Sequence, residues 1–149
     1  MYTHHQDTLE AYAKQVQDDK NVIALLLAGS IAKGWEKETS DVDVMLVKTE
    51  EAYQAHIARN QLATFDNEIA TYEGGYVDVK IISKQFMLDV LSHGSEVAKS
   101  AFLGAKVILS HDHEIGHLLE HICQYPETER DEKIRSFVTQ VMLWRWYVS

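Results

Sequence analysis

The chain has 149 residues, of which 46% are hydrophobic and 25% charged, the composition of one globular domain with its own core. Acidic residues outnumber lysine and arginine by 23 to 14, and the net charge of −9 argues against general nucleic-acid binding, which needs basic surface. No apolar run is long enough to cross a bilayer, and the N-terminus lacks a signal-peptide pattern. A single cysteine, Cys123, excludes an internal disulfide, so we expect a cytoplasmic protein.

The first part of the chain alternates helical and strand patterns. Apolar residues at helical spacing predict an amphipathic helix, and the continuous apolar run after it predicts a buried strand. The elements expected here are a helix over 5–18, a strand over 22–28, a short helix within 31–36, a strand over 42–47 and a helix over 50–60.

The second part begins with a predicted hairpin, because two strand-like segments, 67–72 and 76–82, flank Glu73-Gly74-Gly75. Ser83 and Ser95 are expected to cap two helices that end near Gly94 and Gly104. A short strand over 106–109 and helices over 113–124 and 128–149 complete the set, with Pro126 between the last two. This order predicts an α/β (α+β) fold, a small mixed sheet flanked by helices.

We divide the chain into a main domain, residues 1–125, and a C-terminal helix, residues 126–149. The end of this helix is strongly apolar and contains Trp144 and Trp146. Such a segment needs a surface to pack against. It either closes the core, or is covered by a missing C-terminal helical domain or by a second copy in a homodimer.

A phosphate site is expected where the first predicted strand ends. Gly29 allows a phosphate to approach the backbone closely, and Ser30 opens a helix whose free N–H groups attract anions. The serine hydroxyl adds a further hydrogen bond.

Three aspartates lie in strand contexts that suit a metal site. Asp41 and Asp43 are two residues apart, so both side chains project from one face of the second strand. Asp78 interrupts the β-branched run of a later strand, where aspartate is unfavourable by propensity. Adjacent carboxylates repel one another unless a cation lies between them, and oxygen ligands suit Mg²⁺ or Mn²⁺. Three carboxylates suffice to hold two such ions.

These elements resemble the DNA polymerase β-like nucleotidyltransferase superfamily, over about residues 20–82. The resemblance rests on Gly29-Ser30 after a strand, on Asp41-Val42-Asp43 and on Asp78. Within the superfamily, the chain most resembles the small bacterial branch that includes aminoglycoside nucleotidyltransferases. The resemblance implies a nucleotidyltransferase-like fold and metal-dependent transfer of a nucleoside monophosphate from an NTP, with ATP expected, to a hydroxyl. The acceptor implied is a small, aminoglycoside-like molecule. The larger enzymes carry a C-terminal helical domain, which would begin about where this chain stops.

A competing motif, His113-Glu114-Ile115-Gly116-His117, matches the His-Glu-x-x-His pattern of zinc peptidases, and His121 lies one turn further on. Gly116 weakens the helix inside this motif, and only 28 residues follow His121, so we do not expect a peptidase. Lys33 and Lys80 are candidates for phosphate contacts or for surface ion pairs. For Trp35 we expect ordinary packing rather than stacking on a base.

Two other functions stay open at this point. One is a minimal nucleotidyltransferase antitoxin that acts on a helical protein partner, since such proteins are short, acidic and similar in motif. The other is a non-catalytic nucleotide-binding module that retains the fold. The sequence names neither the acceptor nor the oligomeric state.

Overall fold

The computed structural model of the chain describes residues 1–124, 127 and 130–148. In chain order its elements are α1 (Thr3–Val16), β1 (Val22–Leu27), α2 (Gly29–Lys33), β2 (Val42–Lys48), α3 (Glu50–Ala58), β3 (Ala63–Asp66), β4 (Val77–Ser83), α4 (Lys84–His93), α5 (Glu96–Ala101), β5 (Lys106–Ser110), α6 (Glu114–Cys123) and α7 (Arg130–Val148). No helix among the described residues has the length and apolar character needed to cross a membrane.

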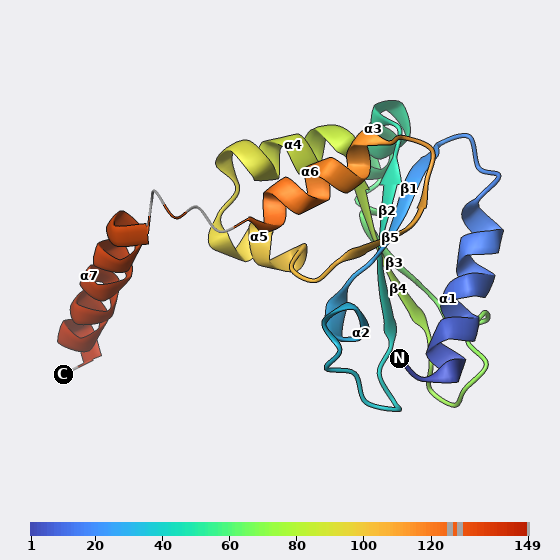
Figure 1. Cartoon of the computed structure of the whole chain (residues 1–149), viewed down its shortest axis with the longest axis horizontal. Helices are drawn as coiled ribbons and strands as arrows, with labels where there is room; N and C mark the ends of the chain where they lie inside the picture. The colour runs from blue at the N-terminus through green and yellow to red at the C-terminus, as the bar shows by residue number, and fades with distance from the viewer. Residues whose placement is uncertain (125–126, 128–129, 149) are drawn as a thin grey trace.

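The five strands form one mixed sheet in the order β3-β4-β2-β1-β5. The central pair β2 and β4 is parallel, whereas the other neighbouring pairs are antiparallel. Helix α1 lies on one side of the sheet and helices α4, α5 and α6 lie on the other (Figure 1). The structure therefore confirms the α+β fold with a small mixed sheet flanked by helices.

Each face of the sheet carries its own apolar cluster, because strand side chains alternate between the two faces. The cluster under α1 includes Val42, Val44, Val77 and Val79, each at most 1% exposed. The cluster under α4 to α6 contains Met45, Val47 and Ile82 from the strands and Met87, Phe102 and Ile115 from the helices. Asp43 and Asp78 lie on this second face, since Asp43 is two residues from Met45 and Asp78 is four residues from Ile82.

The hairpin prediction was right in kind but wrong in its first arm. That arm is β3, which ends at Asp66, and residues 67–72 are not a strand. The cause is a side-chain turn: Asp66 Oδ1 accepts hydrogen bonds from the backbone N–H groups of Glu68 and Ile69, at 3.0 and 3.2 Å. Such bonds draw the chain away from the sheet ladder, so the connection from β3 to β4 is a ten-residue loop, 67–76.

The two serine caps were predicted correctly. Ser83 Oγ accepts from the N–H of Phe86 and Ser95 Oγ accepts from the N–H of Ala98. Cys123 is partly buried and packs against the second cluster, and burial raises the pKa of its thiol. Pro126 and the predicted boundary at 125–126 fall outside the described residues.

The C-terminal helix α7 does not close the core. It lies at the far end of the molecule from the sheet (Figure 1), and Trp144 and Trp146 are 71% and 85% exposed. An ion pair joins it to α5, from Lys133 Nζ to Glu96 Oε1 at 2.5 Å. The first alternative for this segment was therefore wrong, and burial by another domain or a second copy stays a prediction.

Candidate active site

The three predicted aspartates meet at one end of the central strands. β2 and β4 pair in a parallel register that places Asp43 directly beside Asp78. Asp41 stands two residues before Asp43, just ahead of β2. One oxygen of each of the three carboxylates lies within 4.8 Å of the other two, and all three residues are half-buried. Among the described residues this is the one group of three or more His, Cys, Asp or Glu side chains placed to hold a metal ion.

The three carboxylates of this cluster repel one another, although Lys80 pairs with Asp78. Burial raises the pKa of the Asp43 carboxyl, and the neighbouring charges of Asp41 and Asp78 raise it further. The charge of Lys80 and a hydrogen bond from the Ser30 backbone act in the opposite direction without cancelling this effect. A carboxylate in this state gains most from a cation at the shared oxygens.

Gly29 is required at the start of α2 because it lies against Asp43. Its φ is +63°, and a Cβ atom at this position would stand 1.9 Å from Asp43 Oδ2. The N–H of Ala28 donates to the carbonyl oxygen of Asp43 at 2.9 Å. The Gly29-Ser30 turn therefore lies directly against the aspartate cluster.

Two tyrosines that the sequence analysis missed brace Asp41. The hydroxyl of Tyr76 donates to the Asp41 carboxylate, which is the largest cause of the raised pKa of Tyr76. The hydroxyl of Tyr72 donates to the carbonyl oxygen of Ser40, at 2.7 Å. Tyr76 could have been found from its spacing, since it lies two residues before Asp78 and so shares its face.

The lysines and Trp35 have specific contacts. Lys80 Nζ pairs with both oxygens of Asp78, at 2.7 and 3.0 Å. Of the two roles considered for Lys80, phosphate contact and ion pair, the structure shows the ion pair. Lys33 Nζ stands 5.6 Å from the centre of the Trp35 ring. Trp35 is 73% exposed, so the ordinary packing role expected for it was wrong.

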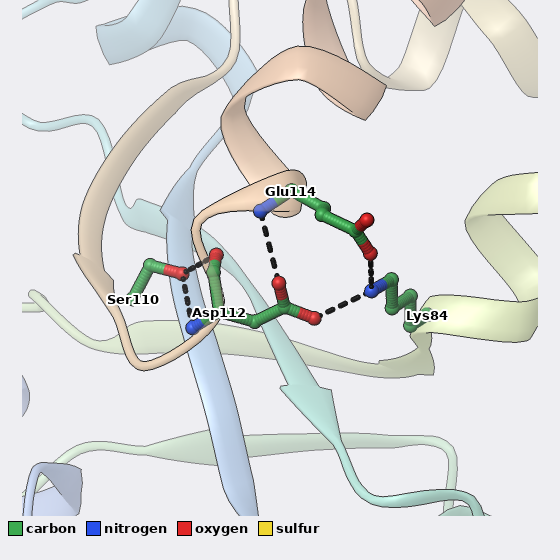
Figure 2. A network of polar contacts seen from close by, with 4 residues as sticks. All are labelled: Lys84, Ser110, Asp112 and Glu114. Atoms are coloured by element: carbon green, nitrogen blue, oxygen red, sulfur yellow. Dashed lines mark hydrogen bonds and ion pairs between the residues drawn. The ribbon is translucent and has the colours of Figure 1, made fainter.

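The His-Glu-x-x-His motif is not built as a peptidase site. α6 begins only at Glu114, so His113 precedes the helix. Figure 2 shows Lys84 Nζ held between Asp112 Oδ2, at 2.6 Å, and Glu114 Oε2, at 2.5 Å. This network joins α4 to α6, and within the described part of the chain the motif's side chains do not form a group placed to hold a metal ion.

A mixed sheet that presents Gly-Ser after its first strand and three aspartates at its central parallel pair defines a nucleotidyltransferase. Residues 1–85 match the family model described as "Poly(A) RNA polymerase, mitochondrial-like, central palm domain", and the chain belongs to this family. The match contains all five predicted site residues and confirms the resemblance to the nucleotidyltransferase superfamily.

Solved structures include distant likenesses. A chain described as "Crystal structure of the toxin-antitoxin with AMP-PNP" is 15% identical with a TM-score of 0.44, and the comparison covers 89% of this chain and 97% of that one. A nucleotidyltransferase-like protein from Exiguobacterium sibiricum 255-15 is 13% identical with a TM-score of 0.49; 85% of this chain covers 40% of that protein. No curated protein matches the chain. The assignment to the family therefore rests on the palm-domain match.

Proposed function

We propose that the protein transfers a nucleoside monophosphate from an NTP, with ATP expected, to a hydroxyl of a small molecule and releases pyrophosphate. The observation that carries this proposal is the convergence of Asp41, Asp43 and Asp78 within 4.8 Å. In this proposal Asp41 and Asp43 are the metal ligands, Asp78 completes the metal site and acts on the acceptor hydroxyl, and Gly29 and Ser30 bind the nucleotide phosphates.

The donor set fits Mg²⁺ or Mn²⁺. All three donors are carboxylate oxygens, which these hard cations prefer to nitrogen or sulfur. Burial raises the pKa of Asp43, and the charges of Asp41 and Asp78 raise it further, so a cation bound at these oxygens would relieve their mutual repulsion. When bound, the metal would supply positive charge to the triphosphate oxygens and to the departing pyrophosphate.

The protein's own groups would then do the following. Backbone N–H groups at Gly29-Ser30 would hold the phosphates beside Asp43, because a Cβ at Gly29 is excluded there and the approach is close. Asp78 would accept the acceptor's hydroxyl proton as the oxygen–phosphorus bond forms at the α-phosphate. The bond from that phosphorus to the β-phosphate oxygen would break, and its electron pair would leave with pyrophosphate.

The acceptor is the least determined part of the proposal. An aminoglycoside-like acceptor follows from the initial resemblance, and the net charge of −9 suits a cationic molecule. The family description names an RNA polymerase, but the same acidic charge opposes an RNA acceptor, since RNA binding requires basic surface. A panel of acceptors therefore has to include an RNA oligonucleotide beside the small molecules.

The test combines metal-dependent NTP binding by calorimetry with pyrophosphate release in the presence of Mg²⁺. Asp41→Asn should weaken metal and nucleotide binding, because one anionic ligand is lost. Asp78→Asn should spare NTP binding and lower turnover by about 10²–10⁴-fold, the usual contribution of a general base. Asp18→Asn removes an exposed carboxylate outside the cluster and should change neither quantity. If Asp41→Asn and Asp78→Asn bind Mg²⁺-NTP and turn over like the wild type, the site assignment is wrong.

The exposed apolar surface of α7 favours a second candidate, a minimal nucleotidyltransferase antitoxin with a helical protein partner. Phe137, Val141 and Trp144 are each more than half exposed and follow one another at helix–helix contact spacing. Nucleotide transfer to a copurifying helical protein, and to no small molecule of the panel, would select this candidate. Binding of Mg²⁺-NTP without any transfer would instead indicate a non-catalytic nucleotide-binding module.

A further inference from the structure

We propose that α7 pairs with α7 of a second copy of the chain, in antiparallel orientation, along one apolar face. This face, the α7 stripe, follows the i, i+3, i+4, i+7 spacing of a single helix surface. Its members are each between 48% and 71% exposed: Ile134, Phe137, Val138, Val141 and Trp144. Such an assembly goes beyond the proposed function and does not depend on it.

α7 needs a surface to pack against. In proteins most of the stability of a helix comes from packing its apolar face. The sheet lies at the other end of the molecule (Figure 1), and neither apolar cluster of the main domain includes a described residue of α7. An exposed apolar surface of this kind marks a place of association. The side chains of the stripe decide which partner fits.

The α7 stripe has the positions of a two-stranded helix pair. Ile134 and Val141 occupy position a of a heptad, and Phe137 and Trp144 occupy position d, so the stripe follows most of the helix. The other exposed apolar side chains of α7 lie beside or behind the stripe and only in the C-terminal half: Met142, Leu143, Trp146 and Tyr147. A helix partner that lies along α7 therefore uses the stripe.

The sizes of the side chains favour a second copy in antiparallel orientation. Antiparallel helices pair position a of one with position d of the other, which sets Ile134 against Trp144 and Phe137 against Val141. Each layer then holds one aromatic and one β-branched side chain, and the layers are equally wide. A parallel pair would set Trp144 against Trp144 and Val141 against Val141, so wide and narrow layers would alternate.

The charges beside the stripe favour the same register. Asp131 and Arg145 are both exposed and occupy position e, the position that sets partner and orientation in helix pairs. In the antiparallel register Asp131 lies beside Arg145 of the second copy, and two-fold symmetry repeats the pair at the other end. Val138 lies beside its own counterpart near the axis. α7 is thus complementary to itself in size and in charge.

The antiparallel arrangement also keeps two acidic domains apart. Each chain has a net charge of −9. A helix of 19 residues is about 28 Å long, more than the screening length of about 8 Å at physiological ionic strength. The two main domains would extend from opposite ends of the helix pair, whereas a parallel pair would place them at the same end.

The first experiment is sedimentation of the full chain over a range of concentrations, without nucleotide or metal. The wild type should form dimers. Val141→Lys should raise the dissociation constant at least about tenfold, because it places a charge inside the stripe. Leu143→Lys is the matched control: Leu143 is similarly exposed but lies off the stripe, so dimerisation should not change. Both positions are exposed, so the main domain should fold normally in both variants.

Charge reversal tests the register. Arg145→Asp and Asp131→Arg each place like charges together at both ends of the dimer, and each should raise the dissociation constant roughly three- to tenfold. A mixture of the two variants restores opposite charges at both ends and should form a heterodimer about as tightly as the wild type does. A parallel pair brings these two positions nowhere near each other, so neither single reversal would weaken it.

Spin labels measure the orientation directly. Glu132→Cys and Thr139→Cys, each made with Cys123→Ala, carry labels at the same heptad position on the back of the stripe. In the antiparallel dimer the labels at 139 lie near the two-fold axis. The labels at 132 lie about 20 Å apart along the helix axis, so their distance should be clearly the longer of the two. Equal distances at both positions would indicate a parallel pair.

Each outcome supports the pairing or overturns it. A wild type that stays monomeric up to about 100 μM would overturn it, and binding of a helical protein to such a monomer would assign the stripe to that partner. Equal loss of dimers in Val141→Lys and Leu143→Lys would show that the stripe is not the interface. Unchanged dimers in both charge reversals, or equal label distances, would refute the antiparallel register. Because nucleotide and metal are absent, none of these results depends on transfer activity.

Discussion

Replacing Asp43 by asparagine should stabilise the metal-free protein although it removes a candidate functional group. Two carboxylates, Asp41 and Asp78, lie within 4.8 Å of the Asp43 oxygens. At that distance one pair of like charges repels by about 0.9 kcal/mol with the dielectric constant of water, and two pairs by about 1.7 kcal/mol. The lost attraction to Lys80 offsets part of this gain. We expect the free energy of unfolding to rise by about 1 kcal/mol.

The stability difference between Asp43→Asn and the wild type should depend on pH, and the raised pKa of Asp43 fixes the direction of this dependence. Burial and the two neighbours raise the pKa of Asp43 above its ordinary value, so the folded state holds this proton more tightly than the unfolded chain does. Wild-type stability from this group is present at acid pH and is lost as the pH rises through the raised pKa. The advantage of Asp43→Asn should therefore be full at neutral pH and vanish at acid pH, where wild-type Asp43 is itself neutral.

The assay is urea denaturation at several pH values, with a chelator and then with Mg²⁺. Added Mg²⁺ should stabilise the wild type by mass action and should have a much smaller effect on the variant. At a sufficient Mg²⁺ concentration the wild type should therefore become the more stable of the two proteins. Asp18→Asn controls for the loss of one negative charge far from the cluster. A metal-free variant that is less stable than the wild type at neutral pH, or equal to it at every pH, would refute this reasoning.

The remaining predictions address the turn, the histidines and the last helix. Gly29→Ala should lower the free energy of unfolding, measured in urea, by about 1–3 kcal/mol and weaken nucleotide binding, because its Cβ meets the Asp43 carboxylate. Gly34 also has a positive φ but faces open space, so Gly34→Ala measures the backbone strain alone. His113→Ala and His117→Ala should leave NTP binding by calorimetry intact, and a stoichiometric zinc with peptidase activity would contradict this. Sedimentation should show self-association that Trp144→Lys abolishes; a monomeric wild type would argue against a homodimer.

Local sequence signals predicted the elements whose causes are local. The apolar runs of β1 and β2 and the serine caps at Ser83 and Ser95 were all readable, because each depends on periodicity or on one side chain three residues away. The first arm of the hairpin was misplaced because the Asp66 side-chain turn competes with strand pairing. Competition of this kind leaves no mark on hydrophobic periodicity.

The residue types of the candidate site could be predicted from the sequence, but not which of these residues lie next to one another. Asp41 and Asp43 share a face by spacing alone, and the β-branched run around Asp78 suggested a third carboxylate on a paired strand. That Asp78 stands directly beside Asp43 could not be found in this way, since it depends on which strand pairs with β2 and in which register. Long-range pairing of this kind is set by the whole sheet rather than by any local segment.

The register of β2 against β4 ties the core to the site. Val42 faces Val77 and Val44 faces Val79, each nearly inaccessible under α1, while Asp43 and Asp78 alternate with them on the opposite face. A slip of one residue in this parallel pair would move Asp78 to the apolar face and bring a valine beside Asp43. Burying an unpaired carboxylate there would cost several kcal/mol, far more than the repulsion between the two aspartates in the native register. The hydrophobic effect on one face of the sheet therefore holds like charges together on the other face, so the candidate cation site is assembled without a cation.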